Sequence, residues 1–386
     1  RAPLAARRVL CVASCKGGVG KSSVAANLAA GLARRGQRVG ILDMDVYGPS
    51  LPSLLPMPPG LQVHGDRDGR IVPVRWGSPA LPHELQLMSY GYLRPGEFAA
   101  IRGPIVSGIA QQLLTGVAWD SLDTLVIDMP PGTGDVHLTV AQQIPVDAAV
   151  MVTTPQQLAL VDVEKGIKMF DKVGIPTVML VENMSYFDCG GCSARHFIFG
   201  EGGGKRLAQM FGIESFHQLP IDPVFNSASR ESSDGPVLAR GEHSAPTIVQ
   251  AMHGLVAQLD EEMDRLAASR GSRPKAEASM GGAILTVAGG GRPPVSLQAR
   301  PLRLACSCAH CIDEWTGEPR LDPAKVPEDV AVVKVESAGR YAAVVHWSDM
   351  HQSIFPFTRL WSMADTAGVP LERPVPGPQS VVHAHT

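Results

Sequence analysis

Eight consecutive residues near the N-terminus have the types and spacing of a phosphate-binding loop. They read Cys-Lys-Gly-Gly-Val-Gly-Lys-Ser, and the glycines let the backbone turn so that successive N–H groups point at phosphate oxygens. Lys21 can reach the terminal phosphates, and Ser22 can ligate Mg2+. Cys15 stands where the usual pattern begins with glycine, which leaves the anion-binding part of the loop intact. The residues that we expect to contact nucleotide here are Cys15, Lys16, Gly17, Gly18, Val19, Gly20, Lys21, Ser22 and Ser23.

Carboxylates follow two predicted strands, where they could serve the same loop. Asp43 and Asp45 occur in Ile-Leu-Asp-Met-Asp, and Asp128 ends Leu-Val-Ile-Asp before a Pro-Pro-Gly segment. The first two can hold the Mg2+ shell and orient the attacking water, while Asp128 suits a water-mediated Mg2+ contact. We therefore expect Asp45 and Asp128 to act in catalysis and Asp43 to belong to the nucleotide site.

Seven cysteines, five of them in two tight clusters, favour metal ligation in a reducing compartment over a disulfide framework. Cys189 and Cys192 form a Cys-Gly-Gly-Cys segment whose glycines expose N–H groups that can bond to sulfur. Two thiolates cannot complete a four-cysteine site. A symmetric dimer would supply the other pair, which predicts a bridging [4Fe-4S] cluster. A bridging zinc ion, a redox dithiol and a plain loop are the alternatives.

The elements that must position these residues alternate between strands and helices. Near-continuous runs of Val, Ile, Leu, Ala and Met predict strands that are buried on both faces. The predicted strands cover residues 9–14, 38–43, 124–128, 148–153 and 177–182. The predicted helices cover residues 22–35, 165–172 and 247–265. This order predicts an α/β fold with a mostly parallel sheet. Together with the phosphate-binding loop, it predicts a P-loop NTPase unit over residues 1–266.

The rest of the chain has a different composition. Residues 267–293 are rich in Ser, Gly, Arg, Lys and Pro and are predicted to be a linker, although 283–287 could pair as a strand. Residues 294–365 are predicted to form a small β-rich C-terminal domain with strands at 330–335, 341–347 and 352–355. Residues 366–386 are proline-rich, which predicts a disordered tail.

Charge and hydropathy exclude some classes of function. The chain has 37 acidic and 34 basic residues, a net charge of -3, which argues against a generally basic surface for nucleic acid. No apolar run approaches the roughly 18 residues of a membrane span, which argues against membrane insertion. Because the chain begins with Arg1 rather than methionine, we expect it to be a processed product.

Three further segments carry a family resemblance over about residues 8–265. Residues 45–52 read Asp-Val-Tyr-Gly-Pro-Ser-Leu-Pro, 182–187 read Glu-Asn-Met-Ser-Tyr-Phe, and 198–204 read Ile-Phe-Gly-Glu-Gly-Gly-Gly. Together with the CxxC pair they closely resemble the Mrp/ApbC-type iron–sulfur cluster carrier ATPases.

The phosphate loop has the Lys-Gly-Gly-x-Gly-Lys-Ser form of the deviant Walker A class. The resemblance implies that Lys16 acts in catalysis by crossing a dimer interface to the partner's phosphates. It also implies that Asn183, Pro220 and Asp222 contact adenine. Since the Asn-Lys-x-Asp pattern of guanine recognition is missing, ATP is preferred over GTP.

The second cysteine cluster places Cys306, Cys308 and Cys311 within six residues. The unit around it resembles the small domain at the N-terminus of gamma-butyrobetaine hydroxylase, which implies that these three cysteines and His351 hold a structural Zn2+. Three sulfurs and one nitrogen satisfy tetrahedral Zn2+, and a closed site would stabilise a small domain. His310 is a nearer alternative ligand with poorer geometry, and an accessory iron–sulfur site is the alternative to zinc.

These observations predict an ATP-dependent homodimeric scaffold that assembles a [4Fe-4S] cluster at its interface and passes it to apo-proteins. A weak ATPase activity would serve the transfer, and upstream iron–sulfur assembly factors would supply the cluster. Cys15 and the C-terminal domain resemble most the chloroplast high-chlorophyll-fluorescence members of the family, which implies the chloroplast stroma and photosystem I among the recipients. An electron-donating reductase resembling nitrogenase iron protein and a partition or positioning ATPase are the alternatives.

Overall fold

The computed structural model describes residues 5–367 apart from several short segments. Those segments are 59, 95–102, 133, 193, 223–224, 226–234, 241–245, 269–273, 291, 307, 309, 313–317 and 339–341. The chain divides into two compact units: residues 1–271 with 338–342 form the first, and residues 272–337 with 343–386 form the second. No helix in the described part of the chain is both long enough and apolar enough to span a membrane.

The first unit is built on a nine-stranded sheet. Its strands are β1 (Ala6–Ala13), β2 (Val39–Asp43), β3 (Val74–Trp76), β4 (Leu85–Ser89), β5 (Leu122–Asp128), β6 (Ala148–Thr153), β7 (Thr177–Asp188), β8 (Arg195–His196) and β9 (Ser215–Pro220). Its helices are α1 (Lys21–Arg34), α2 (Leu51–Leu54), α3 (Tyr90–Leu93), α4 (Gly103–Thr115), α5 (Asp135–Gln143), α6 (Gln157–Lys172), α7 (Gly203–Phe211) and α9 (Pro246–Ala268), with a 3-10 turn η1 (Val237–Ala239).

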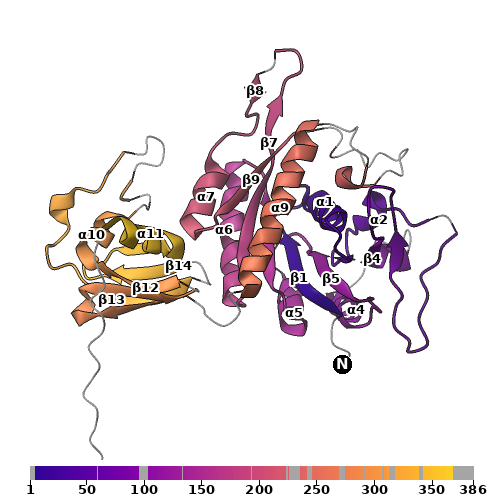
Figure 1. The fold of residues 1–386 in the computed structure, drawn as a ribbon, viewed down its shortest axis with the longest axis horizontal. Coiled ribbons are helices and arrows are strands. Elements are labelled where there is room, and N and C mark those ends of the chain that lie inside the picture. The colour runs from indigo at the N-terminus through magenta and orange to yellow at the C-terminus, as the bar shows by residue number, and fades with distance from the viewer. Residues whose placement is uncertain are drawn as a thin grey trace, which may run out of the picture. The chain divides into compact units, whose positions relative to one another are not determined.

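The strand order is β3-β4-β2-β5-β1-β6-β7-β8, and β9 also pairs with β7. Among the described residues of this sheet, all strand pairs are parallel except β3 with β4 and β7 with β8. One hydrophobic core lies between the sheet and helices α1 and α9, and a second lies between the sheet and helices α4, α5, α6 and α7 (Figure 1). The predicted α/β P-loop fold with a mostly parallel sheet is therefore confirmed, and burial on both faces explains the continuous apolar runs.

Parallel pairing brings the carboxyl ends of several strands to one edge of the sheet. Asp43 at the end of β2 pairs in register with Asp128 at the end of β5, and Val12 of β1 pairs with Asp128 from the other side. The loop that follows β1 therefore begins beside Asp128, and Asp43 lies one strand further along the same edge.

Strand β7 is longer than the sequence predicts. The predicted strand ends at residue 182, but β7 continues to Asp188 and pairs there with β8 in a hairpin (Figure 1). Met184 interrupts the regular strand with a φ of +55°, and the register with β9 shifts between Glu182 and Tyr186. The polar residues after 182 hide this extension from a pattern based on apolar runs.

The second unit contains two three-stranded sheets, ordered β10-β11-β12 and β13-β14-β15. Its elements are β10 (Lys275–Ser279), η2 (Met280–Gly282), β11 (Ile284–Gly289), β12 (Arg292–Gln298), α10 (Ala299–Leu304), η3 (Pro323–Lys325), β13 (Val332–Ala338), β14 (Ala342–Trp347), β15 (Gln352–Pro356) and α11 (Phe357–Ala367). The unit has a hydrophobic core of its own, with Trp347, Phe355 and Phe357 almost completely buried.

The segment 267–293, predicted as a linker, contains β10 and β11 in the structure. Leu285 and Val287 of β11 are fully buried, in agreement with the possible strand at 283–287. Strand β10 gives no apolar signal because it is mostly exposed, and antiparallel pairing with β11 holds it in place. The predicted tail, 366–386, lies outside the described residues except for the last two residues of α11.

Candidate nucleotide and metal sites

The phosphate-binding loop joins β1 to α1 at the carboxyl edge of the sheet. Gly18 and Gly20 have φ values of +77° and +83°, which glycine adopts without strain. Gly17 is exposed, and Val19 packs into the core. Gly20 directly precedes α1, so the free N–H groups of the first helical turn, which includes Ser23, favour an anion at this loop.

Strand β7 contacts this loop through Asn183. The Asn183 side-chain amide donates to the Val19 carbonyl oxygen at 2.9 Å, and the residue is buried. A Cβ atom on Gly20 would lie 2.3 Å from the Asn183 Nδ2, so this position requires glycine. The Asn183 Oδ1 is also buried and accepts no hydrogen bond from the described residues. The structure thus places Asn183 against the loop, and its contact with adenine stays a prediction.

Lys21 is buried beside a carboxylate at the end of β5. Its ammonium group forms an ion pair with Asp128 and lies 3.2 Å from the Ser22 hydroxyl. Burial raises the pKa of Asp128 in spite of the opposing effect of Lys21. The Asp128 Oδ2 is buried and has no hydrogen-bond partner in the described part of the chain. An acceptor left in this state, beside a serine hydroxyl and a phosphate loop, suits a hydrated cation such as Mg2+.

Asp43 anchors the loop that follows β2. Its carboxylate accepts hydrogen bonds from the backbone N–H groups of Asp45 at 3.0 Å and Leu51 at 3.2 Å, and from the Ser89 hydroxyl at 3.1 Å. Burial, and then the charge of Asp128, raises the pKa of Asp43 to about 7. Half-buried Asp45 accepts from a backbone N–H at 3.0 Å, and its charge contributes to the raised pKa of Asp128. The structure therefore brings the three predicted carboxylates together.

The first residues of the loop pack on helix α6. The Lys16 Nζ lies 3.8 Å from the Asp162 Oδ2, and both side chains are about one-third exposed. A Cβ atom on Gly166 would lie 2.5 Å from the Cys15 sulfur, so the thiol occupies the space that this glycine leaves. Burial raises the pKa of Cys15 to about 11, so the thiol is protonated at neutral pH. The role of Lys16 in a partner's site stays a prediction.

The remaining nucleotide candidates follow strand β9, which pairs with β7. Pro220 ends β9 and is buried, and Asp222 is half-buried. The N–H group of Ile221 between them donates to the Tyr186 carbonyl oxygen at 2.6 Å, which ties this segment to β7. Their contact with adenine also stays a prediction.

The CxxC segment forms the turn of the β7–β8 hairpin. Asp188 pairs with Arg195 across the hairpin, and their side chains form two hydrogen bonds of 2.8 and 3.1 Å. The Arg195 guanidinium lies 3.7 Å from the centroid of the Tyr186 ring. The N–H group of Cys189 donates to the Ala194 carbonyl oxygen at 3.0 Å. These contacts join the two strands of the hairpin at the base of the turn.

The hairpin thiols are accessible. Cys189 is partly exposed and Cys192 is exposed, and the N–H groups of Cys192 and Gly191 lower the pKa of Cys189. The Cys192 sulfur lies 3.6 Å from the His196 Nε2, and one ligand atom each from Cys189, Cys192 and His196 lies within 4.8 Å of the others. Sequence reasoning missed His196, although its position four residues after Cys192 was a signal.

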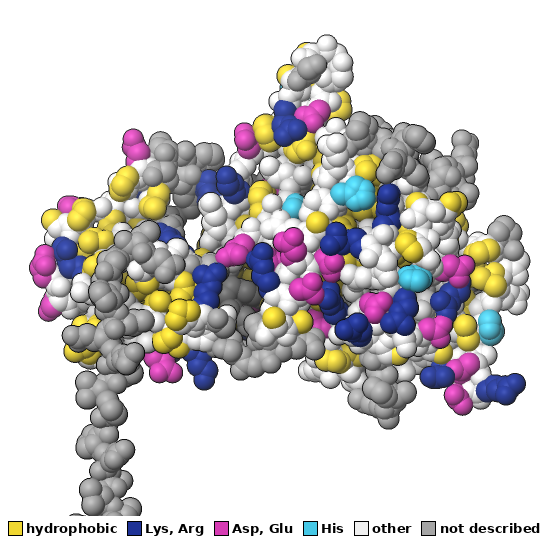
Figure 2. Space-filling model, viewed as in Figure 1, with side chains coloured by type: hydrophobic (Ala, Val, Ile, Leu, Met, Phe, Trp, Pro, Cys, Tyr) yellow, Lys and Arg dark blue, Asp and Glu magenta, His cyan; other side chains and the backbone are white. Residues whose placement is uncertain are grey.

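Apolar side chains lie next to these thiols in the sequence. Ile198 and Phe199 begin two residues after the end of β8 and are 59% and 39% exposed. Figure 2 shows hydrophobic side chains on this projecting part of the first unit, beside a basic and an acidic group.

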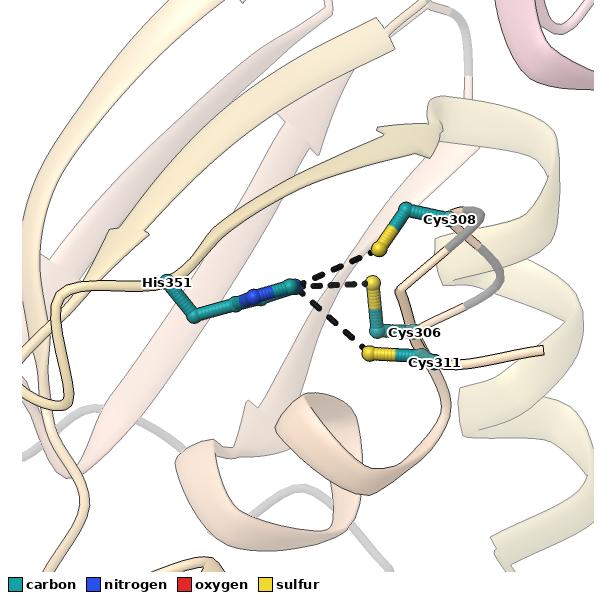
Figure 3. Close-up of side chains that lie close together, drawn as sticks. All are labelled: Cys306, Cys308, Cys311 and His351. Carbon is teal, nitrogen blue, oxygen red and sulfur yellow. Dashed lines mark hydrogen bonds between the residues drawn. The ribbon is translucent and has the colours of Figure 1, made fainter. Parts of the chain in front are cut away.

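The second cysteine cluster converges on one histidine nitrogen (Figure 3). The sulfur atoms of Cys306, Cys308 and Cys311 lie 3.3, 3.6 and 3.7 Å from the His351 Nε2. The cysteines follow helix α10, and His351 precedes strand β15. A tetrahedral Zn2+ with bonds of about 2.3 Å to sulfur and 2.0–2.1 Å to nitrogen separates these atoms by about 3.5 Å. The four residues expected from the sequence therefore fit this ion. The structure does not place His310 in this group of ligands.

Burial shapes the chemistry of this second site. Cys306 and Cys311 are only 3% and 2% exposed, and burial raises their pKa values, that of Cys311 to about 12. Burial lowers the pKa of His351, which favours the neutral imidazole that a metal binds. Without a cation these thiols stay protonated, so metal binding would release protons.

A buried arginine accompanies this site, and sequence reasoning missed it. Arg303 is 4% exposed, lies 3.5 Å from the Cys311 sulfur, and pairs with Asp349 at 2.9 Å. The Asp349 carboxylate in turn accepts a hydrogen bond from the backbone N–H group of His351 at 3.1 Å. Three thiolates around one Zn2+ would carry a net charge of minus one, and the guanidinium next to the Cys311 sulfur would offset part of it. Its position three residues before Cys306 was the only signal in the sequence.

Two family models match the chain. Residues 5–259 match the NUBPL iron-transfer P-loop NTPase model of the ParA group. Residues 279–361 match the gamma-butyrobetaine hydroxylase-like, N-terminal model.

Named proteins resemble the chain over different lengths. The Fe-S cluster assembly factor HCF101, chloroplastic, of Oryza sativa subsp. japonica is 38% identical over 369 residues, which cover 94% of this chain and 66% of that protein. The iron-sulfur cluster carrier protein of Pseudomonas fragi is 48% identical over 216 residues, covering 56% of this chain and 73% of that protein. The chain thus spans only 66% of the length of the chloroplastic relatives that it matches.

A solved structure also resembles the first unit. It is a nucleotide-binding protein from Archaeoglobus fulgidus in complex with ADP, which is 37% identical with a TM-score of 0.51. The match covers 63% of this chain and 90% of that one.

Proposed function

The chain belongs to the NUBPL iron-transfer P-loop NTPase family, and we propose that it is an ATP-dependent carrier of iron–sulfur clusters. In this proposal two copies of the chain assemble one [4Fe-4S] cluster between them and pass it to apo-proteins. The names of the curated relatives from Oryza sativa subsp. japonica and Pseudomonas fragi support the cargo. One observation about strand β7 carries the proposal. The strand leads into the exposed CxxC turn, and it also contains Asn183, whose side chain is hydrogen-bonded to the phosphate loop.

The nucleotide half of the proposal rests on the buried charges at the carboxyl edge of the sheet. Ser22, Asp43 and Asp128 would hold Mg2+, which would draw charge from the phosphates of ATP. Asp128 has a buried oxygen without a partner among the described atoms, which supports this assignment. Asp45 would orient the attacking water. When nucleotide binds, the Lys21 ammonium group would leave Asp128 and contact the phosphate oxygens instead. We expect this protein to hydrolyse ATP slowly, because ATP would serve to change its conformation and not to convert a metabolite.

The cargo half rests on the hairpin. Each chain offers two accessible thiols, Cys189 and Cys192, and a [4Fe-4S] cluster requires four. A two-fold symmetric pair of chains supplies the other two. The exposed apolar side chains of Ile198 and Phe199, which follow the hairpin in the sequence, support contact with a second copy, because burying them would stabilise the pair.

The coupling between the two halves rests on the geometry of β7. Asn183 is hydrogen-bonded to the phosphate loop, and Cys189 follows six residues later, directly after the strand ends at Asp188. Met184 interrupts the strand between them, at a φ of +55° that costs a non-glycine residue about 1–3 kcal/mol. A loop that moves on binding ATP would pull on Asn183 and so shift the turn that holds the thiols. ATP would thereby change how firmly two chains hold one cluster.

The recipients and compartment follow from the relatives alone. The chloroplastic relatives support the chloroplast stroma as the compartment. Apo forms of iron–sulfur proteins there, photosystem I among them, would be the acceptors, and upstream assembly factors would be the donors. The proposal involves no nucleic acid and no insertion into a membrane.

Anaerobic reconstitution tests the proposal. The full chain is incubated with iron and sulfide, and iron, sulfide and oligomeric state are measured for wild type and for Cys189→Ala/Cys192→Ala. We expect four irons per dimer in the wild type and loss of the cluster in the double variant. Cys11→Ala, which removes a core thiol of β1, is the control and keeps the cluster. An equal cluster content in the double variant would reject the site.

Transfer is the second measurement. The loaded protein is mixed with an apo-ferredoxin-like acceptor with and without ATP, and holo-acceptor formation is followed by its absorbance. We expect ATP to change the transfer rate. A strictly monomeric protein that binds no cluster under any loading condition would end the proposal.

A further inference from the structure

The β7–β8 hairpin offers one ligand more than a shared cluster needs. A [4Fe-4S] cluster takes four thiolates, two from each chain, so His196 would have no place on it. Yet the His196 Nε2 lies 3.6 Å from the Cys192 sulfur, and both cysteines and the histidine present ligand atoms within 4.8 Å of one another. A single chain therefore gathers two sulfurs and one nitrogen without help from a partner.

The spacing of these atoms matches the edge of a tetrahedron around one ion. Bonds of about 2.3 Å to sulfur and 2.0–2.1 Å to nitrogen put sulfur and nitrogen about 3.5 Å apart. The Cys192–His196 distance of 3.6 Å has this value. It also falls within the 3.3–3.7 Å range between the sulfurs and the His351 nitrogen in the second unit.

The hairpin backbone directs His196 toward the thiols. His196 pairs with Phe187 across the two strands, and Cys189 follows Phe187 by two residues, so these side chains share one face of the hairpin. Asp188 and Arg195 form their ion pair on the other face, where Arg195 also lies over Tyr186. That second face holds the histidine in position because it fixes the pairing of the strands.

We propose that the hairpin of a single chain binds one Fe2+ or Zn2+ ion through Cys189, Cys192 and His196. Two thiolates and an imidazole favour these borderline ions over Mg2+ or Ca2+. Cys192 and His196 are both exposed, so the fourth position is open to water or to a small thiol. The inference rests on the proposed function in one respect, because the ion and the shared cluster use the same two cysteines. They are therefore alternative occupants, and His196 is a ligand of the unpaired chain only.

Cobalt serves as the spectroscopic probe. The full chain, cluster-free and anaerobic, first receives one equivalent of Zn2+ to fill the closed site of the second unit, and Co2+ is then titrated in. Thiolate-to-cobalt charge transfer and the visible ligand-field bands report a tetrahedral site. We expect the wild type to take up one equivalent of Co2+ per chain, and Cys189→Ala/Cys192→Ala to take up none.

The decisive variant is His196→Ala. We expect it to bind Co2+ at least about 10-fold more weakly, since loss of even a second-shell partner costs 10–100-fold. The tetrahedral bands should also lose intensity. His64→Ala removes another exposed histidine, distant in sequence from every cysteine, and should titrate like the wild type. A His196→Ala titration that matches the wild type in affinity and spectrum overturns the inference, and so does a wild type that binds no Co2+ at this step.

Reconstitution with iron and sulfide separates this inference from the proposed function. His196→Ala should still assemble the same cluster per dimer as the wild type, because the cluster needs only the thiols. If the His196→Ala dimer fails to assemble the cluster, then His196 serves the paired state and the inference is overturned. If the wild type binds Co2+ through His196 but never assembles a cluster, the proposed function fails and the inference stands.

Discussion

The two cysteine sites of this chain use the same ligand types in opposite surroundings. In the hairpin, Cys192 and His196 are exposed, and backbone N–H groups lower the pKa of Cys189. In the second unit, Cys306 and Cys311 are buried, and burial raises their pKa values. The difference teaches that the residue types in a motif indicate a metal, while burial decides whether that metal can leave. An open site suits cargo, and a closed one suits a resident ion.

The two sites also differ in what they are connected to. The hairpin continues a strand that reaches the phosphate loop, with Asn183 bonded to Val19. The closed site is surrounded by its own unit, where Arg303 and Asp349 lie next to its ligands. Nucleotide should therefore affect the first site and leave the second one unchanged.

The largest effect should come from removing a ligand of the closed site. We expect Cys311→Ser to unfold the second unit, because the binding free energy of a structural zinc, about 10–16 kcal/mol in small domains, is tied to folding. The near-UV circular dichroism of the buried Trp347 and Trp361 reports this loss. Cys192→Ser, a matched change in the open site, should leave that signal intact. An unchanged spectrum for Cys311→Ser would show that the second unit needs no metal.

A smaller effect should come from the arginine beside the closed site. Arg303→Met leaves Asp349 without its partner and the thiolates without a compensating cation, so we expect a loss of about 3–5 kcal/mol in unfolding free energy. Zinc affinity should fall about 10–100-fold. Urea unfolding and competition with a chromophoric chelator measure the two quantities. Lys325→Met removes an exposed positive charge of the same unit as a control, and equal results for both variants would contradict the role of Arg303.

Alkylation of the cluster-free protein, given one equivalent of Zn2+ to fill the closed site and leave the hairpin thiols free, should separate the two sites by a factor of 10 or more in rate. The lowered pKa of Cys189 gives it more thiolate at a given pH, so its labelling should rise at lower pH than that of an ordinary thiol. Cys15, with a pKa raised to about 11, should label slowly at neutral pH. Peptide mapping after pulses of iodoacetamide at several pH values measures these rates. Labelling of Cys311 as fast as Cys189 would break the distinction between an open and a closed site.

The smallest effect should come from Asn183→Ala. The change removes one hydrogen bond to the Val19 carbonyl oxygen, and such a loss costs about 1–3 kcal/mol when the group left behind is buried. We expect weaker nucleotide binding and a reduced effect of ATP on cluster transfer, with the zinc content of the second unit unchanged. Calorimetric titration with nucleotide and the transfer assay measure both. If the ATP effect on transfer persists in full, β7 does not carry the coupling.

The sequence was sufficient for the fold of the first unit, because buried parallel strands produce long apolar runs and the glycines of the phosphate loop have a fixed spacing. It was insufficient where polar residues form strands. The exposed end of β7, where Phe187 and Asp188 pair with β8, and the mostly exposed β10 are held by pairing rather than by apolar burial, and no run of large apolar residues marks them. His196 and Arg303 were missed for a related reason. Their roles depend on strand pairing and on burial, which one-dimensional spacing does not contain.

The two faces of the hairpin limit how its length can vary in other members of the family. Adding one residue between Tyr186 and Cys189 would turn the first thiol onto the side of the Asp188–Arg195 ion pair. Adding two residues here and two to β8 would lengthen the arm and keep the sulfur beside His196. Natural insertions in this arm should therefore come in even numbers, and a homologue with an odd insertion should have lost either the histidine or the ion pair.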